Sequence, residues 1–330
     1  MSDGRTLIVH ASAEDAHADA VAHALRQRGW RVVILVDEEC FETWSIEDGP
    51  DGIFFELFGE RIGLHKVSAV YWRTDYRCRP ADLVASNPSW GEVAEFIAEQ
   101  RERHAYGLWY SVARHVPFIN AIEAGRRAQS KAYQQKLASE IQLRVPKTYS
   151  GSCPASAKVF AQGLWAEGKR CCTKNIEGTR FPIGGVQHAR YTRLFDSEEL
   201  SHIEGLSACP MIFQEYIEKQ HEYRVTVVGR RVFACRIDSQ CSGGDVAVDW
   251  RHYDIPNTPH HECSLSAVDE RRLVDLVQGL GLVYGACDLI RATNGELVFL
   301  EVNSFGAWLW IEDLVGLKIT SAIADALEAL

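Results

Sequence analysis

Apolar and polar positions along this chain predict strands and helices in close succession. Thr6–His10 is a short apolar run typical of a buried strand, and Ala13–Gly29 has the three-to-four-residue apolar spacing of a helix, with Gly29 as its C-terminal cap. Arg31–Val36 returns to strand character, so the chain opens with a strand–helix–strand unit. We therefore expect an α/β fold in which helices cover a parallel sheet.

The first 120 residues continue in the same way. Their further predicted elements are strands at Ile53–Phe58, Val67–Trp72 and Pro117–Ile119 and a long helix over Pro88–Arg114. The Gly-x-Gly-x-x-Gly pattern of dinucleotide-binding units is absent, which disfavours that function for this half. Asn120 can cap a helix over Ala121–Ile141, and the first domain boundary is placed at residue 120.

Two further units follow. The elements predicted for residues 121–210 are a strand at Val145–Tyr149, a helix at Pro154–Ala166, a strand at Lys169–Asn175 and a glycine-bearing loop over 177–187. Those predicted for residues 211–330 are strands at Met211–Tyr216, Tyr223–Val228 and Arg231–Asp238, an irregular segment Ser242–Ser264, a helix Ser266–Gly279, a hairpin Tyr284–Asn303 and a helix Ala322–Ala329. The pattern predicts three domains: 1–120, 121–210 and 211–330.

Composition narrows the class of protein. A net charge of −10 argues against nonspecific binding to nucleic acid or to anionic membranes. The N-terminus lacks a secretory signal, and no apolar run of about 18 residues indicates a membrane span. The ten cysteines are scattered without zinc-site spacing and are interpreted as reduced thiols. We expect a cytoplasmic protein.

The hairpin near the C-terminus carries the strongest chemical signal. A turn centred on Asn294-Gly295 places Asp288 directly opposite Glu301, and Asn303 shares their face because strand side chains alternate. Two carboxylates about 5 Å apart repel each other unless a cation lies between them. All the donors are oxygens, which favours a hard ion, Mg²⁺ before Zn²⁺.

Candidates for nucleotide binding lie upstream of this hairpin. Lys174 ends an apolar strand before the glycine-bearing loop, and Lys131 lies one turn into a helix, after Gln129-Ser130; each, taken alone, is an ordinary exposed lysine. The stretch from Glu215 to Ile217 leaves a buried strand, where backbone groups can meet an adenine edge. Glu222 follows, where a carboxylate can accept ribose hydroxyls. A charged hairpin turn explains this stretch equally well.

Together these residues resemble the ATP-grasp superfamily, whose N-terminal α/β, central and C-terminal domains bind ATP between the last two. The resemblance covers residues 115–330 well and the first 115 less specifically. It implies ATP and Mg²⁺ as cofactors. The implied roles are phosphate binding by Lys131 and Lys174, the adenine hinge at Glu215 and Ile217, the ribose carboxylate Glu222, and Mg²⁺ ligation by Asp288, Glu301 and Asn303.

Finer motifs resemble the microviridin-type graspetide synthetases. These motifs are Tyr71-Trp72-Arg73, Asp249-Trp250-Arg251 and the run from Asn303 to Glu312. Ser304 and Ala307 depart from the residues frequent in that group, proline and glutamine. The resemblance implies a ribosomal precursor peptide, leader and core, as substrate and a homodimer as a common assembly. Arg73, Asp249 and Arg251 are assigned to binding of this peptide; a structural salt bridge explains each of them equally well.

The catalytic assignments concern two arginines. Arg236 lies in an otherwise apolar strand, where an inward guanidinium needs an anion such as phosphate; an edge-strand arginine in solvent is the alternative. Arg224 shares a strand face with Glu222 and contacts the acyl phosphate, orients Glu222, or forms an ion pair with it. Trp308 and Trp310 are expected to pack beneath the site.

The resulting hypothesis is an ADP-forming ligase. It activates Asp or Glu side chains of a ribosomal precursor peptide as acyl phosphates and closes ester or amide cross-links. An ATP-grasp ligase acting on amino acids or on a protein C-terminus would use the same ATP residues, and a non-catalytic ATP-binding scaffold is a further alternative.

Overall fold

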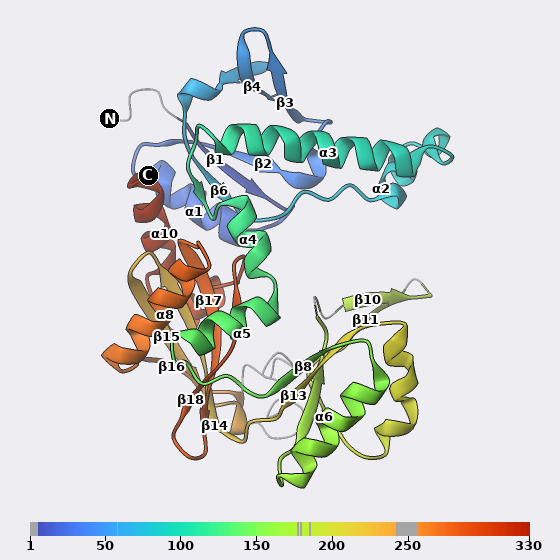
Figure 1. Cartoon of the computed structure of the whole chain (residues 1–330). Helices are drawn as coiled ribbons and strands as arrows, with labels where there is room; N and C mark the ends of the chain where they lie inside the picture. Colours follow the sequence, from blue (N-terminus) through green and yellow to red (C-terminus); the bar gives the residue numbers. More distant parts are fainter. Residues whose placement is uncertain (1–5, 58, 177, 179, 185, 242–256) are drawn as a thin grey trace.

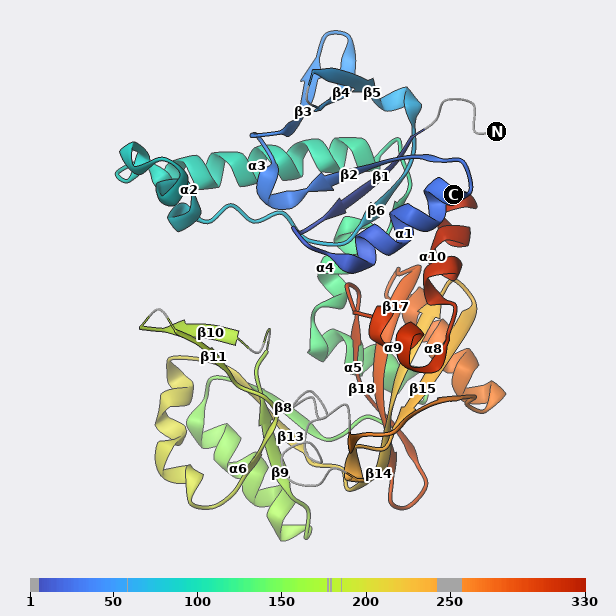
Figure 2. The same ribbon diagram turned by 180° about the vertical axis from the view of Figure 1, so that it is seen from behind.

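The computed structural model describes residues 6–57, 59–176, 178, 180–184, 186–241 and 257–330. These residues form five sheets with helices packed on them. Figures 1 and 2 show three units: an N-terminal unit with the long helix α3, a C-terminal unit beneath it, and a central unit beside the C-terminal one. The predicted mixed α/β class is confirmed.

The N-terminal sheet is parallel throughout. Its strands β1 (Thr6–Ala11), β2 (Arg31–Val36), β6 (Val67–Trp72) and β7 (Phe118–Ile119) are arranged in the order β2-β1-β6-β7. Helices α1 (Ala16–Gln27) and α3 (Ala94–Ala113) cover opposite faces, because Val9 packs in the core with α1 and its neighbour Ile8 packs in the core with α3. The predicted strand–helix–strand opening is therefore correct.

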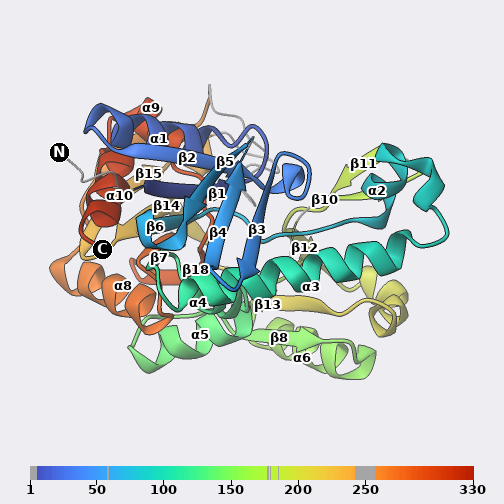
Figure 3. The ribbon, with the colours of Figure 1, turned by 90° about the horizontal axis from the view of Figure 1, so that it is seen from above.

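A small antiparallel sheet lies above this layer, as Figure 3 shows from the top. It consists of β3 (Trp44–Gly49), β4 (Gly52–Leu57) and β5 (Glu60–Gly63), and short helix α2 (Pro80–Ser86) follows β6. The sequence predicted β4 but not its partners, because polar residues dominate β3 and β5. The helix predicted from Pro88 begins at Ala94, after a 3₁₀ turn at Pro88–Trp90.

The single helix predicted over Ala121–Ile141 is two helices, α4 (Ile122–Ala128) and α5 (Lys131–Glu140). Helix α4 ends at Ala128, and Ser130 caps α5 by accepting a hydrogen bond from the Tyr133 amide. Lys131 therefore begins α5. Asn120 was predicted to cap the helix that follows it, but it does not cap α4. Its buried side-chain amide forms hydrogen bonds with the backbone of Val283, Tyr284 and Ser304 instead.

The central unit has an antiparallel sheet backed by one helix. Its elements are β8 (Thr148–Gly151), α6 (Pro154–Ala166), β9 (Cys171–Lys174), β12 (Arg193–Phe195), a 3₁₀ segment (Glu199–Ser207) and β13 (Met211–Glu215), with strand order β12-β9-β13-β8. The loop predicted over 177–187 contains the hairpin β10 (Arg180–Ile183) and β11 (Val186–Ala189) instead. The predicted limit at residue 210 assigns β13 to the last domain, although β13 pairs with β8 and β9.

The C-terminal unit is built on a five-stranded antiparallel sheet with the order β16-β15-β14-β17-β18. The strands are β14 (Lys219–Val228), β15 (Arg231–Ile237), β16 (His260–Cys263), β17 (Tyr284–Ala292) and β18 (Leu297–Asn303). Helix α8 (Ala267–Gly279) covers one face, and α9 (Leu309–Val315) and α10 (Ile319–Glu328) pack on the other. Ser266 caps α8 through the Asp269 amide.

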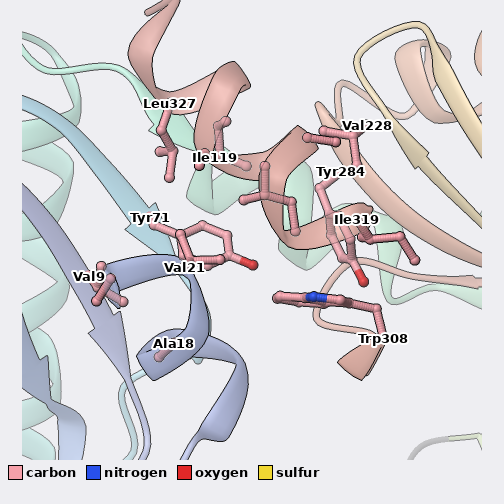
Figure 4. Close-up of a cluster of buried hydrophobic side chains, with 14 of the residues drawn as sticks. Val9, Ala18, Val21, Tyr71, Ile119, Val228, Tyr284, Trp308, Ile319 and Leu327 are labelled. Atoms are coloured by element: carbon pink, nitrogen blue, oxygen red, sulfur yellow. The ribbon is translucent and has the colours of Figure 1, made fainter. Parts of the chain in front are cut away.

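One hydrophobic core joins the N- and C-terminal units. Figure 4 shows Trp308 close to Tyr284 of β17 and to Tyr71 of β6, and all three side chains are buried. Helix α10 packs beside α1 in the same core. Because the core spans both units, it fixes where the start of the chain lies relative to the hairpin formed by β17 and β18.

Candidate functional site

The hairpin β17–β18 brings the predicted acidic pair together. Asp288 is the direct cross-strand partner of Glu301, and Ala286 is the partner of Asn303, so all three predicted ligands lie on one face. Their side chains line one cavity. The predicted pairing of the two carboxylates is correct.

The turn that produces this pairing differs from the prediction. Gly295, with φ of 87°, closes a three-residue turn in which the amide of Ala292 donates to the carbonyl of Glu296 at 2.9 Å. This shifts the register by one residue relative to a two-residue turn. Leu300 then bulges out of β18 between paired residues and shifts the register back. Two irregularities thus cancel before the acidic pair is reached.

Two cations neutralise the acidic pair. Arg224 Nη1 lies 2.9 Å from Asp288 Oδ1, and Lys131 Nζ lies 3.1 Å from Glu301 Oε2. The side chains of Arg224 and Asp288 are 7% and 11% exposed, so this pair is largely withdrawn from water. Removing one partner of such a pair leaves an uncompensated buried charge, which costs about 3–5 kcal/mol.

The cavity itself has a volume of about 480 Å³ and lies between the central and C-terminal units. Its polar lining includes Gln129, Lys131, Lys174, Arg190, Arg224, Asp288, Glu301 and Asn303. A smaller cavity of about 50 Å³ adjoins it and is lined by Glu215, Ile217, Lys219 and Glu222. Lys174, Asp288 and Glu301 line both cavities. The predicted phosphate, hinge, ribose and metal residues are therefore neighbours.

The donor set fits Mg²⁺. Within the described residues, His, Cys, Asp and Glu side chains alone do not form a group of three or more that could hold a metal. The predicted set differs, because its third ligand is the side-chain amide of Asn303. Two carboxylates and one amide oxygen suit an ion that keeps several waters and takes the remaining ligands from substrate phosphates. Asp288, Glu301 and Asn303 would hold such an ion.

Glu215 is fixed at the hinge by several groups of the central unit. Its carboxylate lies 3.1 Å from Arg144 Nη2 and 3.1 Å from Lys169 Nζ, and accepts a hydrogen bond from the Lys147 amide. Burial alone raises the pKa of Glu215, but these bonds and charges outweigh burial and lower it. The side chain thus anchors the strand, while the adjoining segment lines the smaller cavity.

Glu222 is buried at the other end of the hinge segment. Lys219 Nζ lies 2.8 Å from its Oε1, and the Ser239 hydroxyl donates to the same oxygen at 2.7 Å. The alternative in which Glu222 forms an ion pair with Arg224 is wrong, because Arg224 binds Asp288 on the neighbouring strand. Sequence reasoning missed Lys219, whose position inside a polar run resembles an exposed turn.

Arg236 is not where its predicted role requires. It is paired with Tyr223, whose side chain packs in the core beneath α8, and its guanidinium binds Asp238 at 3.0 Å. Arg224 is paired with Cys235, so the two arginines lie on opposite faces of the sheet. Arg236 lines neither cavity described above, and the predicted phosphate contact is corrected.

Arg73 is likewise buried rather than open to a substrate. Its side chain is 6% exposed, Nε lies 3.1 Å from Asp15 Oδ2, and the guanidinium carbon stands 5.0 Å from the centre of the Trp308 ring. The predicted peptide contact of Arg73 is therefore corrected to an internal one. Asp249 and Arg251, the other residues assigned to the peptide, lie outside the described residues.

The segment after β18 contributes more to the cavity than the sequence suggested. Residues 303–307 and Trp310 line it, while Trp308 is fully buried as expected. Gln134 fixes the strand before them, because it bonds both the amide and the carbonyl of Val302. The only signal for this bond in the sequence is that Gln134 is a polar residue one helical turn after Lys131.

Comparison with known proteins gives a consistent result. No protein-family model matches the chain. A β-citrylglutamate synthase B of Danio rerio is 26% identical over 158 residues, which are 42% of this chain and 36% of that protein. A probable α-L-glutamate ligase 1 of Shewanella sp. (strain W3-18-1) is 28% identical over 159 residues, 48% of this chain and 50% of that protein. The chain thus matches half or less of these curated relatives.

Solved structures match over nearly the whole chain. A RiPP-associated ATP-grasp ligase of Chryseobacterium gregarium, in complex with ADP and a leader and core peptide, has a TM-score of 0.85 at 25% identity, covering 98% of this chain and 96% of that one. The macrocyclase MdnC of Microcystis aeruginosa MRC, bound with precursor peptide MdnA, has a TM-score of 0.84 at 24% identity and coverages of 98% and 100%. The ATP-grasp fold and the predicted resemblance are confirmed. No described helix is long and apolar enough to span a membrane.

Proposed function

We propose that this chain is an ATP- and Mg²⁺-dependent ligase that forms macrocyclic ester or amide cross-links in a ribosomal precursor peptide. The observation that supports this most is the group of two acids and two cations, Asp288 with Arg224 and Glu301 with Lys131, lining one cavity. Such a group suits a polyphosphate and a divalent ion. The full-length likeness to peptide-bound ATP-grasp ligases supports the choice of a peptide as substrate.

The proposed reaction has two steps. A carboxylate oxygen of the peptide attacks the γ-phosphorus of ATP, the bond to the β-phosphate oxygen breaks, and ADP leaves an acyl phosphate behind. A hydroxyl or amine of the same peptide then attacks the acyl carbon, expels phosphate and loses its proton. Overall the peptide loses one water per ring. Phosphoryl transfer depends mainly on positioning and on charge neutralisation.

The chain's own residues supply that neutralisation. Bound Mg²⁺ would add charge neutralisation at the phosphates, held by Asp288, Glu301 and Asn303. Lys131, which pairs with Glu301 at 3.1 Å, would also attract phosphate oxygens, since a lysine acts as a mobile point charge. Lys174 lines both cavities and is assigned to the phosphates between them. Arg224 stays paired with Asp288 and holds that acid in place.

Two variants test the proposal. Asp288→Asn and Glu301→Gln should abolish Mg²⁺- and peptide-dependent ADP release while the far-ultraviolet circular dichroism stays unchanged. Glu296→Gln is the matched control, because Glu296 is exposed at the turn of the same hairpin. The substrate to be tested is a short peptide with a Ser/Thr- and Asp/Glu-rich core, sought among the reading frames beside the gene. Normal turnover in either acidic variant contradicts the metal assignment, and a product without loss of water contradicts macrocyclisation.

A ligase for free amino acids is the second candidate, because the curated relatives include glutamate ligases. It shares the ATP residues, so only the acceptor distinguishes the two functions. ADP release with glutamate and a small amine or amino acid, and not with the precursor peptide, would favour it. A non-catalytic scaffold would bind ATP without releasing ADP in either assay.

We also propose a homodimer, as the family resemblance implies, and a cytoplasmic location, which the scattered cysteines favour. The molar mass measured by light scattering tests the assembly, and cell fractionation tests the location.

A further inference from the structure

The segment that follows β18 is held by two hydrogen bonds to its carbonyl groups, one from Arg224 in the cavity lining and one from the buried Tyr284. Arg224 Nη2 donates to the carbonyl of Ala307 at 3.2 Å, and the Tyr284 hydroxyl donates to the carbonyl of Gly306 at 2.6 Å. Arg224 therefore binds Asp288 and this segment at once. Any displacement of the segment moves the guanidinium that balances a predicted metal ligand.

The N-terminal unit holds the same segment from behind. The Trp308 amide donates to Nε2 of His17 at 3.1 Å, and the two rings meet edge to face at 4.5 Å. His17 lies in the first turn of α1, more than 290 residues away in sequence. The contact therefore couples the start of the chain to the metal-binding hairpin through the Trp308–Ala307 peptide unit.

His17 is itself fixed by a network of partly buried side chains. Its Nδ1 lies 3.4 Å from Oδ1 of Asp15, the residue that caps α1, and Asp15 also holds Arg73 at 3.1 Å. An amide donor at Nε2 and a carboxylate at Nδ1 require the tautomer with its proton on Nδ1. The ring is thus held as an acceptor toward Trp308, and Arg73 lies over the ring of Trp308.

We propose that His17 is a positioning residue for the phosphoryl-transfer site. By accepting from Trp308, it fixes the carbonyl of Ala307 and, through that carbonyl, the guanidinium of Arg224. The effect on turnover rests on the function proposed above, whereas the effect on the segment does not. This role explains why an N-terminal unit that supplies none of the residues assigned to ATP is joined so closely to the site.

Two substitutions of His17 test this role, because one removes the hydrogen-bond acceptor and the other keeps it. His17→Leu removes the acceptor and leaves a buried amide without a partner, so the segment should move and kcat should fall about tenfold. His17→Gln keeps an oxygen acceptor at similar reach and should retain kcat within about threefold. The KM for ATP should rise less than kcat falls in His17→Leu, because the predicted hinge and ribose residues lie in the other cavity. His23→Leu, at an exposed position of the same helix, is the matched control.

Hydrogen–deuterium exchange supplies the readout that needs no peptide substrate. Fragments covering residues 303–312 should exchange faster in His17→Leu than in the wild type, His17→Gln or His23→Leu. Equal exchange in all four proteins, or equal losses in the Leu and Gln variants, would overturn the role of His17. If the wild type releases no ADP with any peptide, while exchange follows the predicted order, the proposed function fails and the positioning of the segment stands.

Discussion

Gly306 is the residue at which a single methyl group should disturb the site most directly. A Cβ added there would lie 2.4 Å from the Ala286 Cβ and 2.7 Å from Arg224 Nη2. Carbon atoms attract best at about 3.5–4.0 Å, so the first contact is more than about 1 Å too short. Ala286 is fully buried in the middle of the sheet and cannot withdraw. The segment or the guanidinium must therefore move.

The cost of Gly306→Ala follows from these contacts. Overpacking a well-packed site costs about 1–3 kcal/mol, and here the strain falls on the bond from Arg224 to the Ala307 carbonyl. If about half of it appears in the bound state, affinity for a non-hydrolysable ATP analogue with Mg²⁺ falls about two- to tenfold. Isothermal titration calorimetry measures this change directly.

A second glycine provides the control for this measurement. Gly125 lies in α4 near the same segment, but a Cβ there would be 3.8 Å from the Phe305 ring, an ordinary contact. Gly125→Ala should bind the analogue normally, and its helix should gain up to about 1 kcal/mol. Wild-type affinity in Gly306→Ala would refute the argument that the segment and Arg224 are packed as one unit.

Two further variants test the electrostatic assignments. The pKa of Glu215 is lowered in the folded protein, so its contribution to stability is complete above the unfolded pKa of about 4.3 and is lost as the pH falls through the folded value. Glu215→Gln should therefore be less stable than the wild type at pH 7 in urea denaturation, and this difference in stability should shrink below about pH 4. A difference that stays constant with pH would contradict this. Arg236→Gln should leave the KM for ATP within about twofold of the wild type, because Arg236 lies on the opposite face of the sheet from Arg224; a large rise in that KM would restore the phosphate role first assigned from sequence.

Short-range patterns were enough to predict most elements and the acidic hairpin formed by β17 and β18. Alternation and a turn signal placed Asp288 opposite Glu301, and the structure has that pair. The predicted and observed pairing agree because the longer turn and the bulge at Leu300 shift the register by one residue in opposite directions. No local pattern reveals these two shifts. Local chemistry thus identified which residues matter, while packing on neighbouring strands fixed the register.

Assignments that depended on which way a lone side chain faces were less secure. Arg73 and Arg236 each stood in an apolar run and each was expected to face the cleft, yet one is buried against Trp308 and the other lies on the far side of the sheet. Asn120 had the residue type of a helix cap, but it bonds backbone groups more than 160 positions later in the chain. The residues that decided these orientations are distant in the sequence, so no local pattern identifies them as neighbours.

The sequence by itself therefore determined the fold class, the acidic hairpin and the set of groups suited to a nucleotide, because periodicity, turn chemistry and ligand type are properties of short segments. Only the tertiary structure decided which cations neutralise which acids, and that His17 supports the segment beside Arg224. The physical reason is that charge pairing and backbone hydrogen bonding depend on distances of about 3 Å between groups from distant parts of the chain. Those distances are set when the sheets and helices pack against one another.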